Sequence, residues 1–172
     1  MIKLKNRIQL VFIVIVFTLV SCKSIVKKYY DNGNLMSEYQ TARFDKEIRN
    51  GFYKTFNPDG TLVFEGNYRK DKLNGLNTWY YDNGNLHYRA KYNQDRLWNV
   101  LDYRDIEGNK LEFGQISRGE GKIFIYDEHG EIEAEGNVKN GLKYGTWFIY
   151  TRYNKIEEKY PSNFEHKNKI FL

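Results

Sequence analysis

The sequence predicts an all-β protein: an elongated single sheet of about six antiparallel β-hairpin repeats that follows an N-terminal signal helix. Two observations predict the hairpins. Glycines recur in pairs nine residues apart, and 17% of the 172 residues are aromatic. Aromatic side chains favour strands because they pack well on a pleated surface. A third observation, a continuous apolar segment near the start of the chain, separates the signal helix from the repeats.

The first 21 residues have the regions of an export signal. Basic residues come first, at Lys3, Lys5 and Arg7, and 13 mostly apolar residues follow over 8–20. A helix of that length spans roughly 20 Å, whereas the hydrocarbon core of a bilayer is about 30 Å thick. A permanent transmembrane segment is therefore disfavoured, and we expect a cleaved signal over residues 1–21.

The residues Leu19, Val20, Ser21 and Cys22 resemble the lipobox at which bacterial lipoproteins are acylated and cut. The resemblance implies that the Cys22 thiol accepts the lipid and anchors the mature chain to the inner or outer membrane of a bacterial envelope. Two alternatives remain open, a plain secretory signal with an incidental cysteine and an uncleaved anchor. Because Cys22 is the only cysteine, a disulfide within the chain is excluded.

The basic charge belongs largely to the signal. The whole chain carries a net charge of +5, but without residues 1–21 it has 24 basic and 22 acidic side chains, a net charge of +2. Nucleic-acid binding needs concentrated Lys and Arg, so we expect no nucleic-acid partner. Lys23, Lys27 and Lys28 fall in a predicted tether over residues 22–28. There they either contact anionic lipid headgroups or stay solvated.

The predicted repeat domain, residues 29–172, is built from units of about two dozen residues. The units open at Ser24, Gly51, Gly75, Asn99, Gly121 and Gly145. The repeat turn glycines, nine residues later, are Gly33, Gly60, Gly84, Gly108 and Gly130, with Asn154 in the last unit. The first unit is 27 residues long and contains an insertion near residues 41–50, and the unit that opens at Asn99 is the most degenerate.

Turn chemistry explains the shape of a unit. In the segment 57–60, Pro58 presets φ, Asp59 bonds the backbone and Gly60 takes the left-handed conformation. A loop that ends in a glycine bulge places the fifth residue of a unit opposite the eleventh. The expected pairs are Phe56 with Leu62, Tyr80 with Leu86, Tyr126 with Ile132, and Tyr150 with Ile156.

The fifteenth residue of a unit is small in four cases: Gly66, Ala90, Gly114 and Gly136. A small residue inside a strand marks a bend or a place where a neighbouring ring needs room. We therefore expect Gly136→Val to be more damaging than most surface substitutions.

These units resemble the bacterial variant of the MORN repeat over roughly residues 24–160. One matching set is Gly75, Trp79, Tyr80, Asp82, Asn83, Gly84, Leu86 and Tyr92, and another is Gly121, Tyr126, Gly130, Glu135, Gly136, Asn137, Asn140 and Gly141. The resemblance implies a non-catalytic, curved sheet of hairpins. Members of that family include proteins labelled as antitoxins and envelope lipoproteins, and MORN arrays are linked with protein contacts and membrane association.

The sequence shows no pattern of an enzyme, a metal site or a cofactor site. His87, His129 and His166 lack the spacing of metal ligands, and His129 stands at a turn position. Paired carboxylates can act as acid and base, but acidic residues that recur in register favour a structural role. These residues are Glu38, Glu65 and Glu135, each the fourteenth of its unit.

Aromatic rows are the remaining candidate for a binding surface. Exposed rings bind proteins, glycans or bases; alternatively, tyrosines shield the sheet with their phenols outward. The candidate residues are Phe56, Trp79, Tyr80, Tyr126, Trp147 and Tyr150. Three functions follow as hypotheses: an envelope scaffold for an unidentified protein, an antitoxin or immunity protein that masks a toxin, and a hydrolase or binder of cell-wall glycan.

Overall fold

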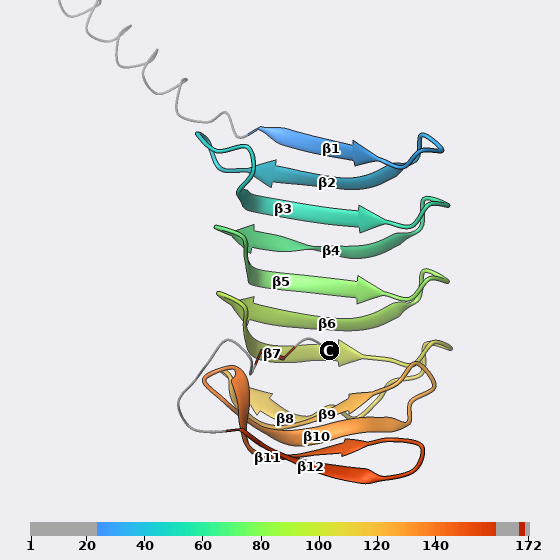
Figure 1. Cartoon of the computed structure of the whole chain (residues 1–172), viewed down its shortest axis with the longest axis vertical. Helices are drawn as coiled ribbons and strands as arrows, with labels where there is room; N and C mark the ends of the chain where they lie inside the picture. Colours follow the sequence, from blue (N-terminus) through green and yellow to red (C-terminus); the bar gives the residue numbers. More distant parts are fainter. Residues whose placement is uncertain (1–23, 161–168, 171–172) are drawn as a thin grey trace, which may run out of the picture.

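The computed structural model describes residues 24–160 and 169–170 (Figure 1). The expected signal helix and the lipobox residues Leu19, Val20, Ser21 and Cys22 lie outside the described residues, as does His166. No helix in the described part of the chain is long and apolar enough to cross a bilayer.

The described residues form twelve strands, and each strand follows the previous one along the molecule (Figure 1). They are β1 (Ile25–Tyr29), β2 (Leu35–Thr41), β3 (Arg49–Phe56), β4 (Leu62–Arg69), β5 (Lys72–Tyr80), β6 (Leu86–Asn93), β7 (Arg96–Tyr103), β8 (Gly114–Ser117), β9 (Glu120–Tyr126), β10 (Ile132–Lys139), β11 (Leu142–Tyr150) and β12 (Lys155–Tyr160). Because β1 begins at Ile25, the tether expected over residues 22–28 is shorter than predicted.

The prediction of an all-β array of antiparallel hairpins is confirmed, but the expectation of a single sheet is wrong. Strands β1 to β7 form one sheet in sequence order, and β8 to β12 form a second sheet, also in sequence order. Every pair of neighbouring strands within a sheet is antiparallel.

The sheet breaks in the degenerate fourth unit. The β6–β7 ladder contains two register shifts, and such bulges increase the local twist of a strand. The next strand, β8, has only four residues. Strand β7 therefore meets the second sheet through single hydrogen bonds instead of a ladder: the Gly119 N–H donates to the Trp98 carbonyl at 2.8 Å, and the Leu97 N–H to the Gly141 carbonyl at 3.1 Å.

The register confirms three expected cross-strand pairs, Phe56–Leu62, Tyr80–Leu86 and Tyr126–Ile132. The fourth is wrong, because Tyr150 lies opposite Lys155 and Ile149 opposite Ile156. The three confirmed hairpins have a register shift beside a turn glycine with φ between 83° and 93°. The last hairpin has Asn154 in place of that glycine and shows no register shift, so its pairing differs by one residue.

A second set of turns joins one hairpin to the next. These two-residue turns are Lys70-Asp71, Gln94-Asp95, Arg118-Gly119 and Asn140-Gly141, and both residues of each have positive φ, as in type I′ turns. They lie at the edge of the molecule opposite the glycine turns. We call the edge formed by residues 42–48, 69–72, 93–96, 117–120 and 139–142 the short-turn edge. The opposite one, with residues 29–35, 56–62, 80–86, 104–110, 126–132 and 150–155, is the long-turn edge.

The core lies on one face of the array, which we call the inner face. Rings from successive strands contact one another along this face of the first sheet: Tyr39 to Tyr53 at 5.5 Å, Phe64 to Trp79 at 4.8 Å, and Trp79 to Tyr88 at 4.3 Å between centroids. The rings thus shield the sheet on this side, with each strand contributing to its neighbour's burial.

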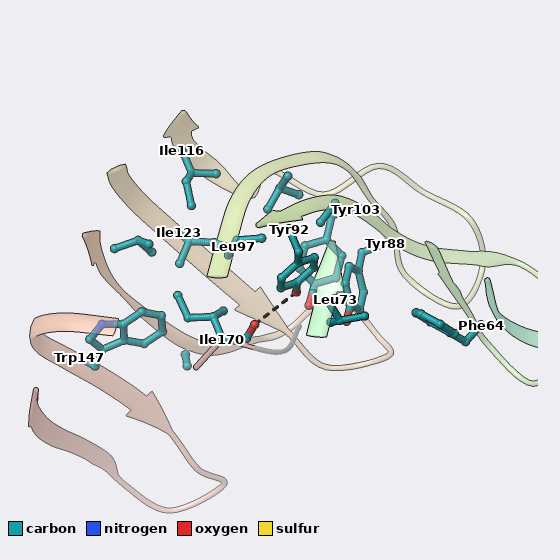
Figure 2. Packing of buried hydrophobic residues seen from close by; sticks show 14 residues of the cluster. Phe64, Leu73, Tyr88, Tyr92, Leu97, Tyr103, Ile116, Ile123, Trp147 and Ile170 are labelled. Carbon is teal, nitrogen blue, oxygen red and sulfur yellow. Dashed lines mark hydrogen bonds between the residues drawn. The ribbon is translucent and has the colours of Figure 1, made fainter. Parts of the chain in front are cut away.

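The two sheets share this core, and Ile170, near the C-terminus, completes it. The fully buried Ile170 side chain belongs to the same cluster as Tyr92 and Leu97 of the first sheet and Ile123 and Trp147 of the second (Figure 2). The Tyr92 hydroxyl donates to the Ile170 carbonyl at 3.3 Å. The C-terminal segment therefore fastens the second sheet to the first.

Candidate binding surface

Strand alternation separates the inner face from an outer face. On β7, Leu97, Val100 and Tyr103 are 0%, 5% and 1% exposed and belong to the core. Their neighbours Trp98 and Leu101 are 39% and 46% exposed. The two bulges of β7 fall at these residues, beside Asn99 and Asp102, which lie opposite the exposed Lys91 and Arg89 of β6. Trp98 and Leu101 therefore lie on the outer face, on the same side as the exposed residues of β6.

An exposed apolar group on the outer face spans β5 to β7. Leu76 of β5 is 43% exposed and lies opposite Lys91 of β6, which lies opposite Asn99 beside Trp98. Exposed Arg89 lies opposite Asp102, beside Leu101. We call Leu76, Arg89, Lys91, Trp98 and Leu101 the outer patch. An exposed tryptophan among leucines and cations has the composition of an interface centre.

The outer patch was not predicted from the repeat pattern of the sequence. A signal was present, since Trp98 directly precedes Asn99, the residue that replaces a glycine at a unit opening. An irregular unit that keeps a large aromatic residue outside the repeat register points to a local role of its own.

Two of the recurring glutamates hold a tyrosine and a lysine on the sheet. The Tyr80 hydroxyl donates to Glu65 at 2.9 Å, and Lys54 lies 3.6 Å from the other carboxylate oxygen. In the second sheet, Tyr150 donates to Glu135 at 2.6 Å. The same geometry in two units fixes the position of the phenols and agrees with a structural role for these glutamates.

Local electrostatics lowers the pKa of Glu135 and raises the pKa of Tyr80. Hydrogen bonds from Lys122, at 2.6 Å, and from Tyr150 lower the pKa of Glu135. Desolvation, together with the Glu65 carboxylate, raises the pKa of Tyr80. Glu135 is therefore held as an anion, and Tyr80 as a neutral phenol that donates to its glutamate.

The structure does not bring the six candidate aromatics together in one surface. The expectation that Trp147 contributes to an exposed row is wrong: it is fully buried, and its indole N–H donates to the Asn137 carbonyl at 2.9 Å. Trp79 packs against the core and stacks on Tyr88. Both tryptophans stabilise the inner face.

The other four candidates are partly buried side chains. Tyr80 and Tyr150 are held by their glutamates, and Tyr126 donates its hydroxyl to the Glu112 carbonyl. Phe56 lies opposite Leu62, and its carbonyl accepts a hydrogen bond from Tyr30 at 2.8 Å. These contacts give all four a packing role, and a contribution to binding stays a prediction.

The histidines occupy structural positions where they are described. The His129 N–H donates to Asp127 at 3.0 Å within a glycine turn, as its turn position predicts. His87 lies among the rings of Tyr81, Tyr88 and Tyr103, and burial lowers its pKa to about 4. Over residues 24–160 and 169–170, no group of three or more His, Cys, Asp or Glu side chains is placed to hold a metal ion.

The fold and its faces define a β-hairpin repeat protein. The family model described as MORN repeat variant matches the chain four times, over residues 25–42, 49–70, 73–94 and 119–140, so these four stretches are similar to MORN-variant repeats. The unmatched stretch 95–118 covers the fourth unit, where the sheet breaks and Trp98 and Leu101 are exposed. No curated protein and no solved structure matches the chain.

Proposed function

We propose that this protein is a non-catalytic, lipid-anchored scaffold of the bacterial cell envelope that binds a protein partner through its outer patch. MORN-variant repeats support a repeat-based binding scaffold. The observation that carries the proposal is the exposure of Trp98, Leu101 and Leu76 on one face at 39–46%, while the inner face is occupied by the core.

The chemistry of the outer patch suits a protein surface. Tryptophan and arginine are the residue types that most often dominate binding energy at protein interfaces. Arg89 and Lys91 flank the apolar side chains and favour a partner with acidic groups around an apolar pocket. The repeats on either side supply a rigid support, since each strand is paired with its neighbours.

The anchor is supported by the sequence around Cys22. The lipobox resemblance supplies the acylated residue, and the first strand, β1, begins at Ile25, only three residues later. An acylated Cys22 would hold the repeats close to the membrane. Metabolic labelling with a fatty-acid analogue tests this, with Cys22→Ala as the control; an unlabelled parent protein would remove the anchor from the proposal.

The partner is tested by crosslinking and capture from native membranes with the parent chain and two double variants. Trp98→Ala with Leu101→Ala removes the patch, whereas Tyr153→Ala with Ile156→Ala removes exposed apolar side chains elsewhere, at 84% and 46% exposure. We expect the first variant to lose at least about 30-fold in capture of a specific protein, the size of one interface hot spot. Equal capture by both variants contradicts the proposal.

The identity of the captured protein separates the alternatives. A toxin whose activity the chain blocks would make the outer patch the surface of an antitoxin or immunity protein. Retention on cell-wall glycan that survives the Trp98 and Leu101 substitutions would instead favour a glycan-directed role.

A further inference from the structure

The two long edges of the array carry opposite charge. The short-turn edge has eight basic and five acidic side chains, whereas the long-turn edge has eight acidic and four basic ones. The eight basic residues are Arg43, Lys46, Arg69, Lys70, Lys72, Arg96, Arg118 and Lys139, and all are exposed. Although residues 22–172 have a net charge of only +2, their basic and acidic side chains are therefore separated across the width of the sheet.

Local bonds occupy four of the five acidic groups of the short-turn edge, Asp45, Asp71, Asp95 and Glu120. Asp71 accepts hydrogen bonds from the backbone and side chain of Arg49, both at 2.9 Å. Asp95 accepts the Leu73 N–H and pairs with Lys169 at 2.7 Å. By contrast, Lys70, Lys72 and Arg118 form no ion pair with any described residue. Lys70, Lys72 and Arg118 are thus placed to face an external anion.

Backbone hydrogen bonds keep the short turns in a row. The Asp95 N–H donates to the Leu73 carbonyl at 3.0 Å, and the Gly119 N–H donates to the Trp98 carbonyl at 2.8 Å. The Gly141 N–H then donates to the Gly119 carbonyl at 2.9 Å. The row continues past the break between the two sheets, so the basic side chains share one edge.

The chain enters the fold at this same edge. The Thr41 N–H, at the short-turn end of β2, donates to the Ser24 carbonyl at 3.0 Å. Cys22 precedes Ser24 by two positions, a span of about 7 Å when extended. An acyl group on Cys22 therefore brings the short-turn edge, and not the long-turn edge, to the membrane.

We propose that the short-turn edge lies along an anionic lipid bilayer, so that the array rests lengthwise on the membrane with its acidic edge directed away. The proposal rests on the acyl anchor of the proposed function. An upright array would place β7 about 29 Å above β1, six strand spacings of ~4.8 Å. That distance exceeds the Debye length of about 8 Å, and Arg96, Arg118 and Lys139 would then contribute nothing to lipid contact.

Fluorescence quenching distinguishes the two orientations. The full acylated chain is labelled at Ser117→Cys on the short-turn edge or at Glu131→Cys on the long-turn edge; both positions are exposed. It is placed in vesicles of phosphatidylcholine and phosphatidylglycerol, 7:3, with nitroxide-bearing headgroups. We expect quenching at Ser117→Cys and none at Glu131→Cys. Absence of quenching at both labels, or equal quenching at both, overturns the proposal.

Charge variants test the physical cause. Replacing Arg96, Arg118 and Lys139 with Gln is expected to abolish the quenching at Ser117→Cys, because each cation near an anionic surface contributes about fivefold to binding. The three substitutions together should weaken binding to the anionic vesicles on the order of 100-fold. The matched control replaces Lys110, Arg152 and Lys155 of the long-turn edge with Gln and should leave the quenching unchanged.

Neutral vesicles separate this inference from the anchor. An acylated chain still binds phosphatidylcholine alone but loses the quenching at Ser117→Cys. If the parent chain carries no acyl group, it fails to bind neutral vesicles, and this outcome contradicts the anchor. The edge contact is then still supported if vesicles with phosphatidylglycerol quench Ser117→Cys and not Glu131→Cys. Quenching at Ser117→Cys that is equal in both lipids, or that survives the three Gln substitutions, contradicts an electrostatic contact.

Discussion

Gly136 of β10 lies directly against the indole of Trp147 on β11. A Cβ atom at position 136 would stand 2.3 Å from the indole ring, inside contact distance. Trp147 is unable to withdraw, because it is fully buried and bonded to the Asn137 carbonyl. The small residue at the fifteenth position of this unit therefore makes room for a ring, one of the two reasons considered from the sequence.

The first prediction is that Gly136→Ala lowers the free energy of unfolding by about 2–3 kcal/mol, and Gly136→Val by more. Chemical denaturation measures both, with the exposed Glu133→Ala as a control that should stay near the parent. In a Trp147→Leu background the effect of Gly136→Ala should shrink below about 1 kcal/mol, since the clash is removed. A midpoint for Gly136→Val equal to that of the parent contradicts the packing described.

The second prediction concerns the strained short turn at Lys70. Lys70 has φ of 52°, a left-handed conformation that Asn adopts more readily than Lys. We expect Lys70→Asn to raise the free energy of unfolding by about 0.5–1 kcal/mol. Lys72→Asn, two residues away in β5, is the control and should give no gain, because Lys72 has no positive φ. A gain of the same size in both variants would argue against turn strain.

Local features of the fold could be predicted from the sequence. The glycine turns, the unit length and three cross-strand pairs depend on residues within one hairpin, and turn chemistry specifies them. Two of the four short turns could not be predicted, because Lys70-Asp71 and Gln94-Asp95 lack the glycine that usually marks a type I′ turn, although Asn140-Gly141 carries that signal. The charge difference between the two edges could not be predicted either, because the edges are defined by which turns lie along them.

Features that depend on distant parts of the chain could not be predicted. The single-sheet expectation failed because bulges in β7 and a four-residue β8 end the ladder, and no local signal fixes the twist there. The sequence pattern around Trp147 also fits an exposed strand position. Trp147 is buried because it packs in the cluster that contains Ile170. The exposure of Trp98 follows from the same break.

The third prediction tests the C-terminal attachment. Ile170 is fully buried among residues of both sheets, so Ile170→Ala should lower the free energy of unfolding by about 2–4 kcal/mol through lost burial and a residual cavity. Ile156→Ala makes the same chemical change at a side chain that is 46% exposed and should cost less than about 1 kcal/mol. Equal losses in the two variants would mean that Ile170 does not join the sheets.

The fourth prediction is a pH dependence that originates at His87. Burial lowers its pKa from the ordinary value of 6.5 to about 4, and its Nε2 has no hydrogen-bond partner among the described residues. Between pH 6.5 and 4 the unfolded chain therefore binds more protons than the folded chain. The contribution of neutral His87 to the free energy of unfolding is fully present above pH 6.5 and is lost as the pH drops through this window.

The loss across that window should approach about 2 kcal/mol, allowing for the partial exposure of the imidazole. His87→Phe keeps a ring among Tyr81, Tyr88 and Tyr103 but has no proton to gain, so its stability should stay level from pH 6.5 to about 4.5. Below that range both proteins lose stability together, because the lowered pKa values of Asp71 and Glu135 stabilise the fold only while these groups are ionised. Urea titrations at half-unit steps of pH measure the difference, and parallel curves for parent and variant between pH 6.5 and 4.5 would assign the dependence to another group.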